Sequence, residues 1–170
     1  MTDTVWISST TFPDTGKAAC LLTWGNNQVL ITPETTLATA RDLTTAAAAA
    51  ETDIALIRSL REDIKADDAV LAGMLTAVRT RRPMPTATRP ALRIDAVAGA
   101  NTGKPYVHIA RGSLKAQLTP DGAREMAGHW TEAAVAAQID VRLRYVLTGH
   151  PQLTPGDVDE IFQQLQSVHR

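Results

Sequence analysis

The chain has 170 residues, of which 44% are hydrophobic and 21% are charged. This composition is typical of a globular protein and excludes an intrinsically disordered one. The formal net charge of −1 provides no global field that would favour nucleic acid or an anionic membrane. The N-terminal sequence lacks the pattern of a signal peptide, and no apolar stretch approaches the roughly 20 residues of a membrane span. We therefore expect a cytoplasmic protein without membrane contact.

The same short motifs occur twice along the chain. Thr15-Gly16-Lys17 returns as Thr102-Gly103-Lys104, and Thr32-Pro33 returns as Thr119-Pro120, in both cases 87 residues later. The same spacing separates Gly25 from Gly112, Asp53 from Asp140, Leu56 from Leu143 and Leu60 from Leu147. Self-similarity at one fixed period indicates duplicated structural units. We predict a first repeat over residues 1–83, a linker over 84–90 and a second repeat over 91–170.

Each repeat begins with a pattern of short strands. Val5 and Ile7 alternate with other residues, as do Ile94 and Ala96, which is the period of a half-buried strand. The Asx-Thr-Gly-Lys sequences at 14–17 and 101–104 predict hairpin turns, because the glycine accepts a positive φ. Second strands are expected over 18–24 and 105–111, and third strands over 28–31 and 114–118. Each repeat should therefore open with a three-stranded antiparallel meander.

Helices are predicted after each meander. The Thr-Pro pairs at 32–33 and 119–120 combine a capping hydroxyl with a proline in the first helical turn. Beyond Asp53 and Asp140 two interpretations remain open, because 141–147 alternates like a strand whereas 54–64 keeps a helical period. We favour helices that begin at these two aspartates, since related repeats should share one structure, with the aspartates as caps. Last helices are expected over 67–81 and 155–168, and the Pro- and Arg-rich segment 79–90 is expected to be extended.

The sequence thus predicts an α+β fold, made by tandem duplication of a three-stranded antiparallel meander followed by two to three helices. The two repeats would form a pseudo-two-fold arrangement, like a homodimer fused into one chain. Their joint would be built either from helix faces lined by small residues or by joining the two sheets.

No residue pattern predicts catalysis. The segment from Gly99 to Lys104 differs from a phosphate-binding loop, because three residues separate the glycines and Pro105 replaces the hydroxyl residue. The four histidines (108, 129, 150 and 169) have no partner at metal-ligand spacing, and Cys20 in its apolar run is expected to be a buried thiol. We expect no catalytic, cofactor-binding or metal-binding residues, no cofactor, and no enzyme activity.

Two surfaces remain as candidates for binding. Aromatic residues Trp6, Phe12 and Trp24 occupy positions that hold Arg93, Gly99 and Arg111 in the second repeat. Exposed aromatics mark protein interfaces, although the same side chains could equally fill the joint between the repeats. The alternative surface is basic and would contact nucleic acid. Its residues are Arg79, Arg81, Arg82, Arg89, His108, Arg111 and Lys115.

The hairpin followed by LTPDGAREMAGHWTEAA at 118–134 resembles small hairpin-helix modules in uncharacterised proteins of high-GC actinobacteria and their phages. The resemblance implies no catalytic residues. We expect a non-catalytic interaction or regulatory protein that binds a protein partner through Trp6, Phe12 and Trp24. One form of this hypothesis is a phage-encoded protein directed at a host protein, and the alternative is a nucleic-acid-binding protein. Partner identity and oligomeric state stay open at this level.

Overall fold

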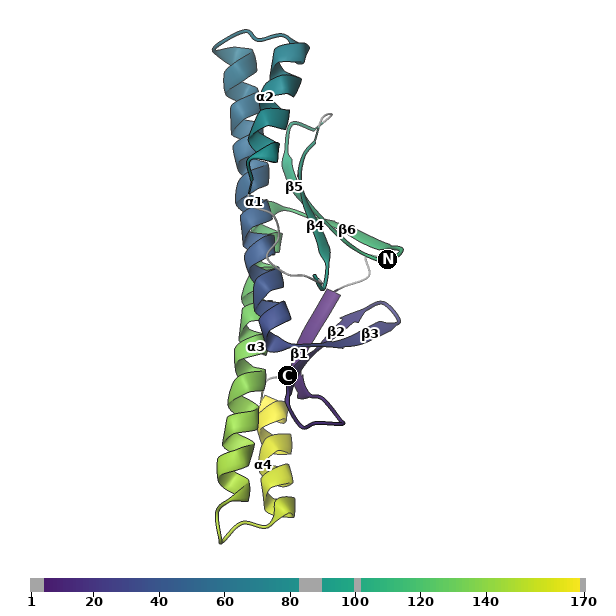
Figure 1. Cartoon of the computed structure of the whole chain (residues 1–170), viewed down its shortest axis with the longest axis vertical. Helices are drawn as coiled ribbons and strands as arrows, with labels where there is room; N and C mark the ends of the chain where they lie inside the picture. Colours follow the sequence, from purple (N-terminus) through teal and green to yellow (C-terminus); the bar gives the residue numbers. More distant parts are fainter. Residues whose placement is uncertain (1–4, 83–89, 100–101, 169–170) are drawn as a thin grey trace.

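The computed structural model describes residues 5–82, 90–99 and 102–168. These residues form an α+β protein with two three-stranded antiparallel sheets and four helices (Figure 1). The predicted fold class is confirmed at this level. In chain order the elements are β1 (Val5–Thr11), β2 (Ala18–Trp24), β3 (Asn27–Ile31), α1 (Pro33–Glu62), α2 (Asp68–Thr80), β4 (Arg93–Ala98), β5 (Pro105–Arg111), β6 (Leu114–Leu118), α3 (Pro120–Thr148) and α4 (Pro155–Val168).

The two predicted meanders are present, with strand orders β1-β2-β3 and β4-β5-β6. Their first hairpins turn at Gly16 and Gly103, whose φ angles of 63° and 60° are in the left-handed region that glycine adopts without steric cost. Ala100 and Asn101 of the second turn lie outside the described residues. The local turn signals therefore sufficed to locate the hairpins.

The long helices α1 and α3 begin where the Thr-Pro pairs predict. The hydroxyl of Thr32 accepts a hydrogen bond from the backbone N–H of Thr35, and that of Thr119 accepts one from Gly122. Both helices then continue without a break through Asp53 and Asp140, so the predicted helix starts and caps at these residues are wrong. Neither glycine nor proline interrupts 34–62 or 129–148, and alanine-rich sequence without such breakers propagates a helix.

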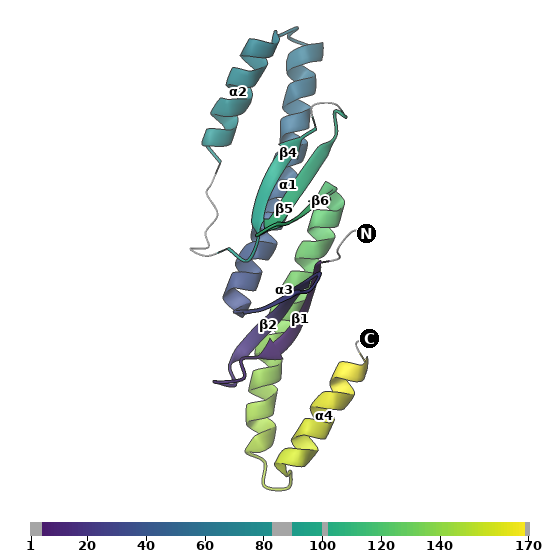
Figure 2. The ribbon, with the colours of Figure 1, turned by 90° about the vertical axis from the view of Figure 1, so that its right-hand side faces the viewer.

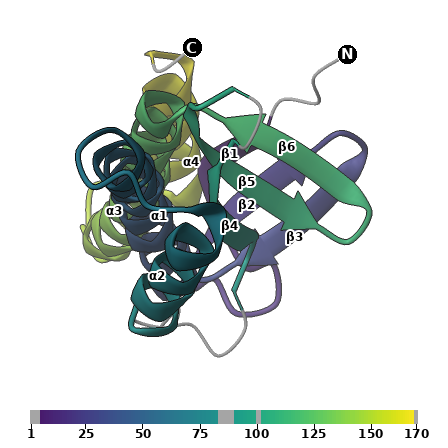
Figure 3. The same ribbon diagram turned by 90° about the horizontal axis from the view of Figure 1, so that it is seen from above.

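Helices α1 and α3 pack on each other in opposite directions at the middle of the molecule (Figure 1). Small buried residues of both helices, among them Ala47 of α1 and Ala127 of α3, belong to one core cluster, and their size allows the helices to approach closely. At the edge of the contact, Arg124 of α3 forms an ion pair with Glu51 of α1. Both sheets lie on the same side of this helix pair, as the view along the long axis shows (Figure 3).

Each long helix packs mainly against the sheet that is more distant in sequence. Helix α1 lies against β4 and β5, and α3 lies against β1 and β2. The main hydrophobic core consequently draws residues from both sheets and both long helices. It contains Leu22, Trp24, Ala40, Leu43, Ala46, Ala47, Ala91, Leu92, Val107, Ile109, Ala123, Ala127 and Trp130. The division at residues 84–90 stays a prediction, because residues 83–89 are outside the described part of the chain.

The shorter helices α2 and α4 fold back along the outer ends of α1 and α3 (Figure 2). Asp67 caps α2 by accepting a hydrogen bond from Val70 N at 2.8 Å, and Thr154 and Asp157 bond reciprocally at the start of α4. Helix α4 has the predicted bounds, and α2 begins one residue later and ends one residue earlier than predicted. Arg79 and Thr80 belong to α2, which corrects the expectation of an extended segment from residue 79. Among the described helices, none is both long and apolar enough to span a membrane.

Candidate interaction surface

The first sheet presents one uncharged face to solvent. Its register places Trp6, Thr23 and Gln28 in one row across the three strands, and Ser8, Leu21 and Leu30 in the next. Side chains alternate between the two faces of a strand, so these rows lie opposite the core residues Leu22 and Trp24. We call this set the outer face of the first sheet. It comprises Trp6, Ser8, Thr10, Leu21, Thr23, Gln28 and Leu30; Ala19 points the same way in the register but is fully buried.

Trp6 dominates this outer face. Its side chain is 65% exposed, whereas Leu21 and Leu30 in the neighbouring row are half-buried. An indole carries a large apolar surface that gains free energy when it leaves water, and its N–H can still donate a hydrogen bond. On the outer face of the first sheet, an accessible aromatic side chain is therefore surrounded by uncharged residues.

The second sheet presents a charged face at the matching positions. By the same register, its outer face comprises Arg93, Asp95, Val97, Tyr106, His108, Ala110, Lys115 and Gln117. Arg93, which stands 87 residues after Trp6, is paired within its own strand, because its Nε lies 2.9 Å from Asp95 Oδ2. Exposed charges of this kind favour hydration over burial in a protein interface. The two sheets thus have the same order of antiparallel strands, but the outer face of the second sheet carries charged side chains and that of the first does not.

Trp24 belongs to the core and not to the outer face. It pairs with Val5 in the register, one residue out of phase with Trp6, and it is 1% exposed. It packs in the core cluster with Leu43 and Leu92, which is the joint-filling interpretation that the sequence left open. Its burial removes Trp24 from any accessible surface in this conformation.

Phe12, which follows β1, occupies an intermediate position. It is half-buried and lines a shallow depression together with Val141 and Arg142 of α3. This depression lies at the end of the β1–β2 hairpin, away from the row that holds Trp6. The structure therefore separates the three predicted aromatic residues, and Trp6 alone stands on the outer face.

The basic residues proposed for nucleic acid are also dispersed. Arg79 and Arg82 both bind Asp53, and Arg81 donates a hydrogen bond to the carbonyl oxygen of Ala77 in its own helix. Arg79 and Arg82 are therefore held by a buried carboxylate, whereas Arg81 is exposed and makes its hydrogen bond at the end of its own helix. Arg89 lies outside the described residues.

The remaining basic residues lie on the second sheet. Arg111 shares the inward face of β5 with Val107 and Ile109, and its guanidinium donates to the carbonyl oxygen of Ala91 at 2.5 Å. His108 Nε2 lies 3.2 Å from Gln117 Oε1 across the strand pair, and Lys115 lies on the same outer face. The fold does not gather the predicted basic set into one patch.

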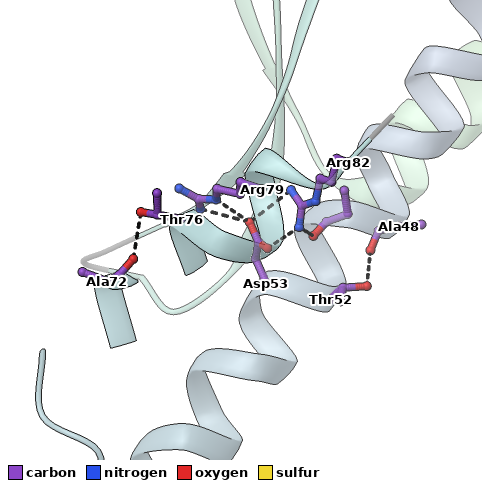
Figure 4. A network of polar contacts seen from close by, with 8 residues as sticks. Ala48, Thr52, Asp53, Ala72, Thr76, Arg79 and Arg82 are labelled. Atoms are coloured by element: carbon purple, nitrogen blue, oxygen red, sulfur yellow. Dashed lines mark hydrogen bonds and ion pairs between the residues drawn. The ribbon is translucent and has the colours of Figure 1, made fainter. Parts of the chain in front are cut away.

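Asp53 forms a polar network that the sequence did not reveal (Figure 4). Its carboxylate is fully buried, accepts a hydrogen bond from Arg79 Nε at 3.0 Å, and pairs with Arg82 Nη2. Arg82 Nη2 also donates to the carbonyl oxygen of Ala49 at 3.1 Å. The network ties the end of α2 to the middle of α1. The helical period of 54–64 could have placed Asp53 on a buried face, but nothing local indicates partners 26 and 29 residues away.

Asp140, which stands 87 residues after Asp53, has a different surrounding. It is half-buried, and Ser9 Oγ of β1 donates a hydrogen bond to its Oδ2 at 3.4 Å. The two aspartates therefore do not make the same kind of contact.

Other polar chemistry is sparse in the part of the chain that the structure describes. No group of three histidine, cysteine, aspartate or glutamate residues lies together there in a way that could hold a metal ion. Cys20 is a free, buried thiol, and burial raises its pKa. No protein-family model matches the sequence, and no curated protein or solved structure is significantly similar to it.

Proposed function

We propose that this chain is a non-catalytic protein-binding module whose contact surface is the outer face of the first sheet. The observation that carries the proposal is the 65% exposure of Trp6 on a face without charged residues. Tryptophan is enriched among the residues that dominate interface energetics, and depletion of charge marks the centre of interfaces. Trp24, which is buried, is not part of this surface.

We also propose that the chain arose by tandem duplication and has a pseudo-two-fold arrangement. The same order of three strands and two helices occurs twice, and the turn glycines and Thr-Pro caps are 87 residues apart. On this basis Trp6 and Arg93 are matched positions in two related sheets. A difference at matched positions of one scaffold is best explained by divergence of the surface, because the scaffold itself tolerates either residue.

A capture experiment tests the binding proposal. The immobilised chain is incubated with lysate of an actinobacterial host, and bound proteins are quantified for the wild type and for Trp6→Arg. This substitution installs the side chain that the second sheet carries at the matched position. We expect the variant to capture at least tenfold less of a specifically bound protein than the wild type does. Its circular dichroism spectrum and unfolding midpoint should stay unchanged.

The matched control is Ile139→Arg, which also installs an arginine in place of an exposed apolar residue, on α3. Capture should survive this control. If Trp6→Arg captures the same protein as well as the wild type does, the outer face of the first sheet is not the contact surface. A mobility shift of DNA or RNA at low salt that weakens steeply as salt rises would instead favour the nucleic-acid alternative.

A further inference from the structure

A second exposed apolar surface lies on α2, away from both sheets. Leu71 and Leu75 face α1 and are buried against Leu60. Beside this buried row, Val70 and Met74 are each 48% exposed and Val78 is 36% exposed. Helix α2 lies at one end of the molecule with α1 as its main neighbour, and its outer side faces away from the rest of the chain (Figure 2).

The exposed stripe of α2 has the same spacing when it is followed from either end. It consists of Asp67, Val70, Met74, Val78 and Arg81, separated by three, four, four and three residues. Spacings of three and four place residues on one helix face. Met74 is at the centre, an apolar residue follows on each side, and a charged residue closes each end. The two terminal charges are opposite in sign.

This pattern is complementary to itself when a second α2 runs in the opposite direction. With the two copies of Met74 opposite each other, Val70 of one chain lies opposite Val78 of the other. Asp67 of one chain then lies opposite Arg81 of the other at both ends of the contact. A parallel arrangement would instead place each charge opposite its own copy, which is repulsive.

The two terminal charges are available for such pairing because both residues are exposed. Asp67 uses Oδ1 to cap α2, and a carboxylate has a second acceptor oxygen. Arg81 donates to Ala77 O through Nη1, and a guanidinium has further donors. Each side chain can therefore keep its own helix-end contact while it binds a partner.

Helix α4 lacks this self-complementary pattern. Its positions 87 residues after Val70, Met74 and Val78 are Asp157, Ile161 and Leu165. An antiparallel contact between two α4 helices would place a carboxylate opposite a leucine. A row of three apolar residues that ends in opposite charges therefore occurs on α2 and not on α4.

We infer that this protein forms a homodimer in which two copies of α2 pack antiparallel about Met74. The contact is isologous, so it closes on itself and leaves the outer face of the first sheet free. Two helices of this length bury less area than a standard protein interface, which makes the dimer weak and dependent on concentration. The inference is independent of the proposed function, because it uses a different surface and a different partner.

Sedimentation velocity on the full chain tests the association. The wild type should shift from 18.3 kDa toward twice that mass as its concentration rises into the range of tens to hundreds of micromolar. Met74→Glu places two like charges opposite each other at the centre and should weaken association at least tenfold. Ile139→Glu, at another exposed apolar site, should leave it unchanged. A wild type that stays monomeric, or a Met74→Glu variant that dimerises normally, overturns the inference.

Disulfide trapping tests the direction of the two helices. Val70→Cys chains mixed with Val78→Cys chains should form cross-linked heterodimers, since these positions face each other in the antiparallel contact. Val70→Cys alone should not cross-link with itself, because the two cysteines would be about 12 Å apart along the helices. The wild type serves as the control, since Cys20 is buried. Self-linked Val70→Cys dimers, or no heterodimers in the mixture, would contradict the antiparallel pairing.

Discussion

Removal of Arg82 should destabilise the protein more than removal of the aspartate that it binds. Asp53 is fully buried, whereas the Arg82 and Arg79 side chains are 24% and 44% exposed. Arg82→Ala therefore leaves a buried carboxylate with Arg79 as its remaining charged partner. Asp53→Ala leaves two arginines whose charged ends can turn toward water.

The expected magnitudes follow from this difference in exposure. Loss of one partner of a buried ion pair costs about 3–5 kcal/mol, and because Arg79 remains 3.0 Å from Asp53 we expect about 3 kcal/mol for Arg82→Ala. Asp53→Ala loses charged hydrogen bonds but strands no buried charge, so we expect about 1.5–2 kcal/mol. The double variant should resemble Asp53→Ala and be more stable than Arg82→Ala by about 1 kcal/mol, since the two residues act as one unit.

Equilibrium unfolding in urea measures these free energies, with Arg81→Ala as the matched control. That neighbouring arginine is exposed and should cost no more than about 0.5 kcal/mol. Hydrogen exchange should show that Arg82→Ala loosens the amides of α2 before those of the shared core. Additive single effects, or an Arg82→Ala variant at least as stable as Asp53→Ala, would refute this account of the network.

Two further predictions concern the protonation of individual groups. Burial raises the pKa of Cys20, so the thiol stays protonated at pH 8. A thiol reagent should therefore modify Cys20 at least a hundredfold faster in denaturant than in the native protein. Equal modification rates would show that the thiol is accessible in the native protein. Hydrogen bonds from the side chain and backbone of Thr154 lower the pKa of Asp157. Its contribution to stability is therefore present above the ordinary aspartate pKa near 3.8 and is lost as pH falls through the lower folded-state value. The unfolding midpoint of Asp157→Asn should change less than that of the wild type over this acidic interval, and identical pH profiles would contradict the assignment.

Local sequence signals located most secondary structure in this chain. Thr32-Pro33 and Thr119-Pro120 marked the starts of α1 and α3, because capping and the tolerance for proline in the first turn are properties of the residues themselves. Glycines at the hairpin turns did the same for the meanders. The expected breaks at Asp53 and Asp140 were wrong, since an acidic residue within alanine-rich sequence does not by itself end a helix.

The faces on which the aromatic residues lie depend on the strand register. Period-two alternation could have separated Trp6 from Trp24, because they fall on opposite faces once the register of β1 and β2 is known. The register itself depends on where the hairpin turns. Leu21 and Leu30 joined the candidate surface only after three strands were aligned.

The sequence by itself determined the strands, the starts of α1 and α3 and the turn positions, because each depends on residues within a few positions of one another. Tertiary structure alone decided that α1 covers β4 and β5 while α3 covers β1 and β2. It also decided that Arg79 and Arg82 neutralise Asp53 instead of serving a basic surface. These contacts join segments distant along the chain, and their free energy depends on burial, which appears only when the whole core is assembled.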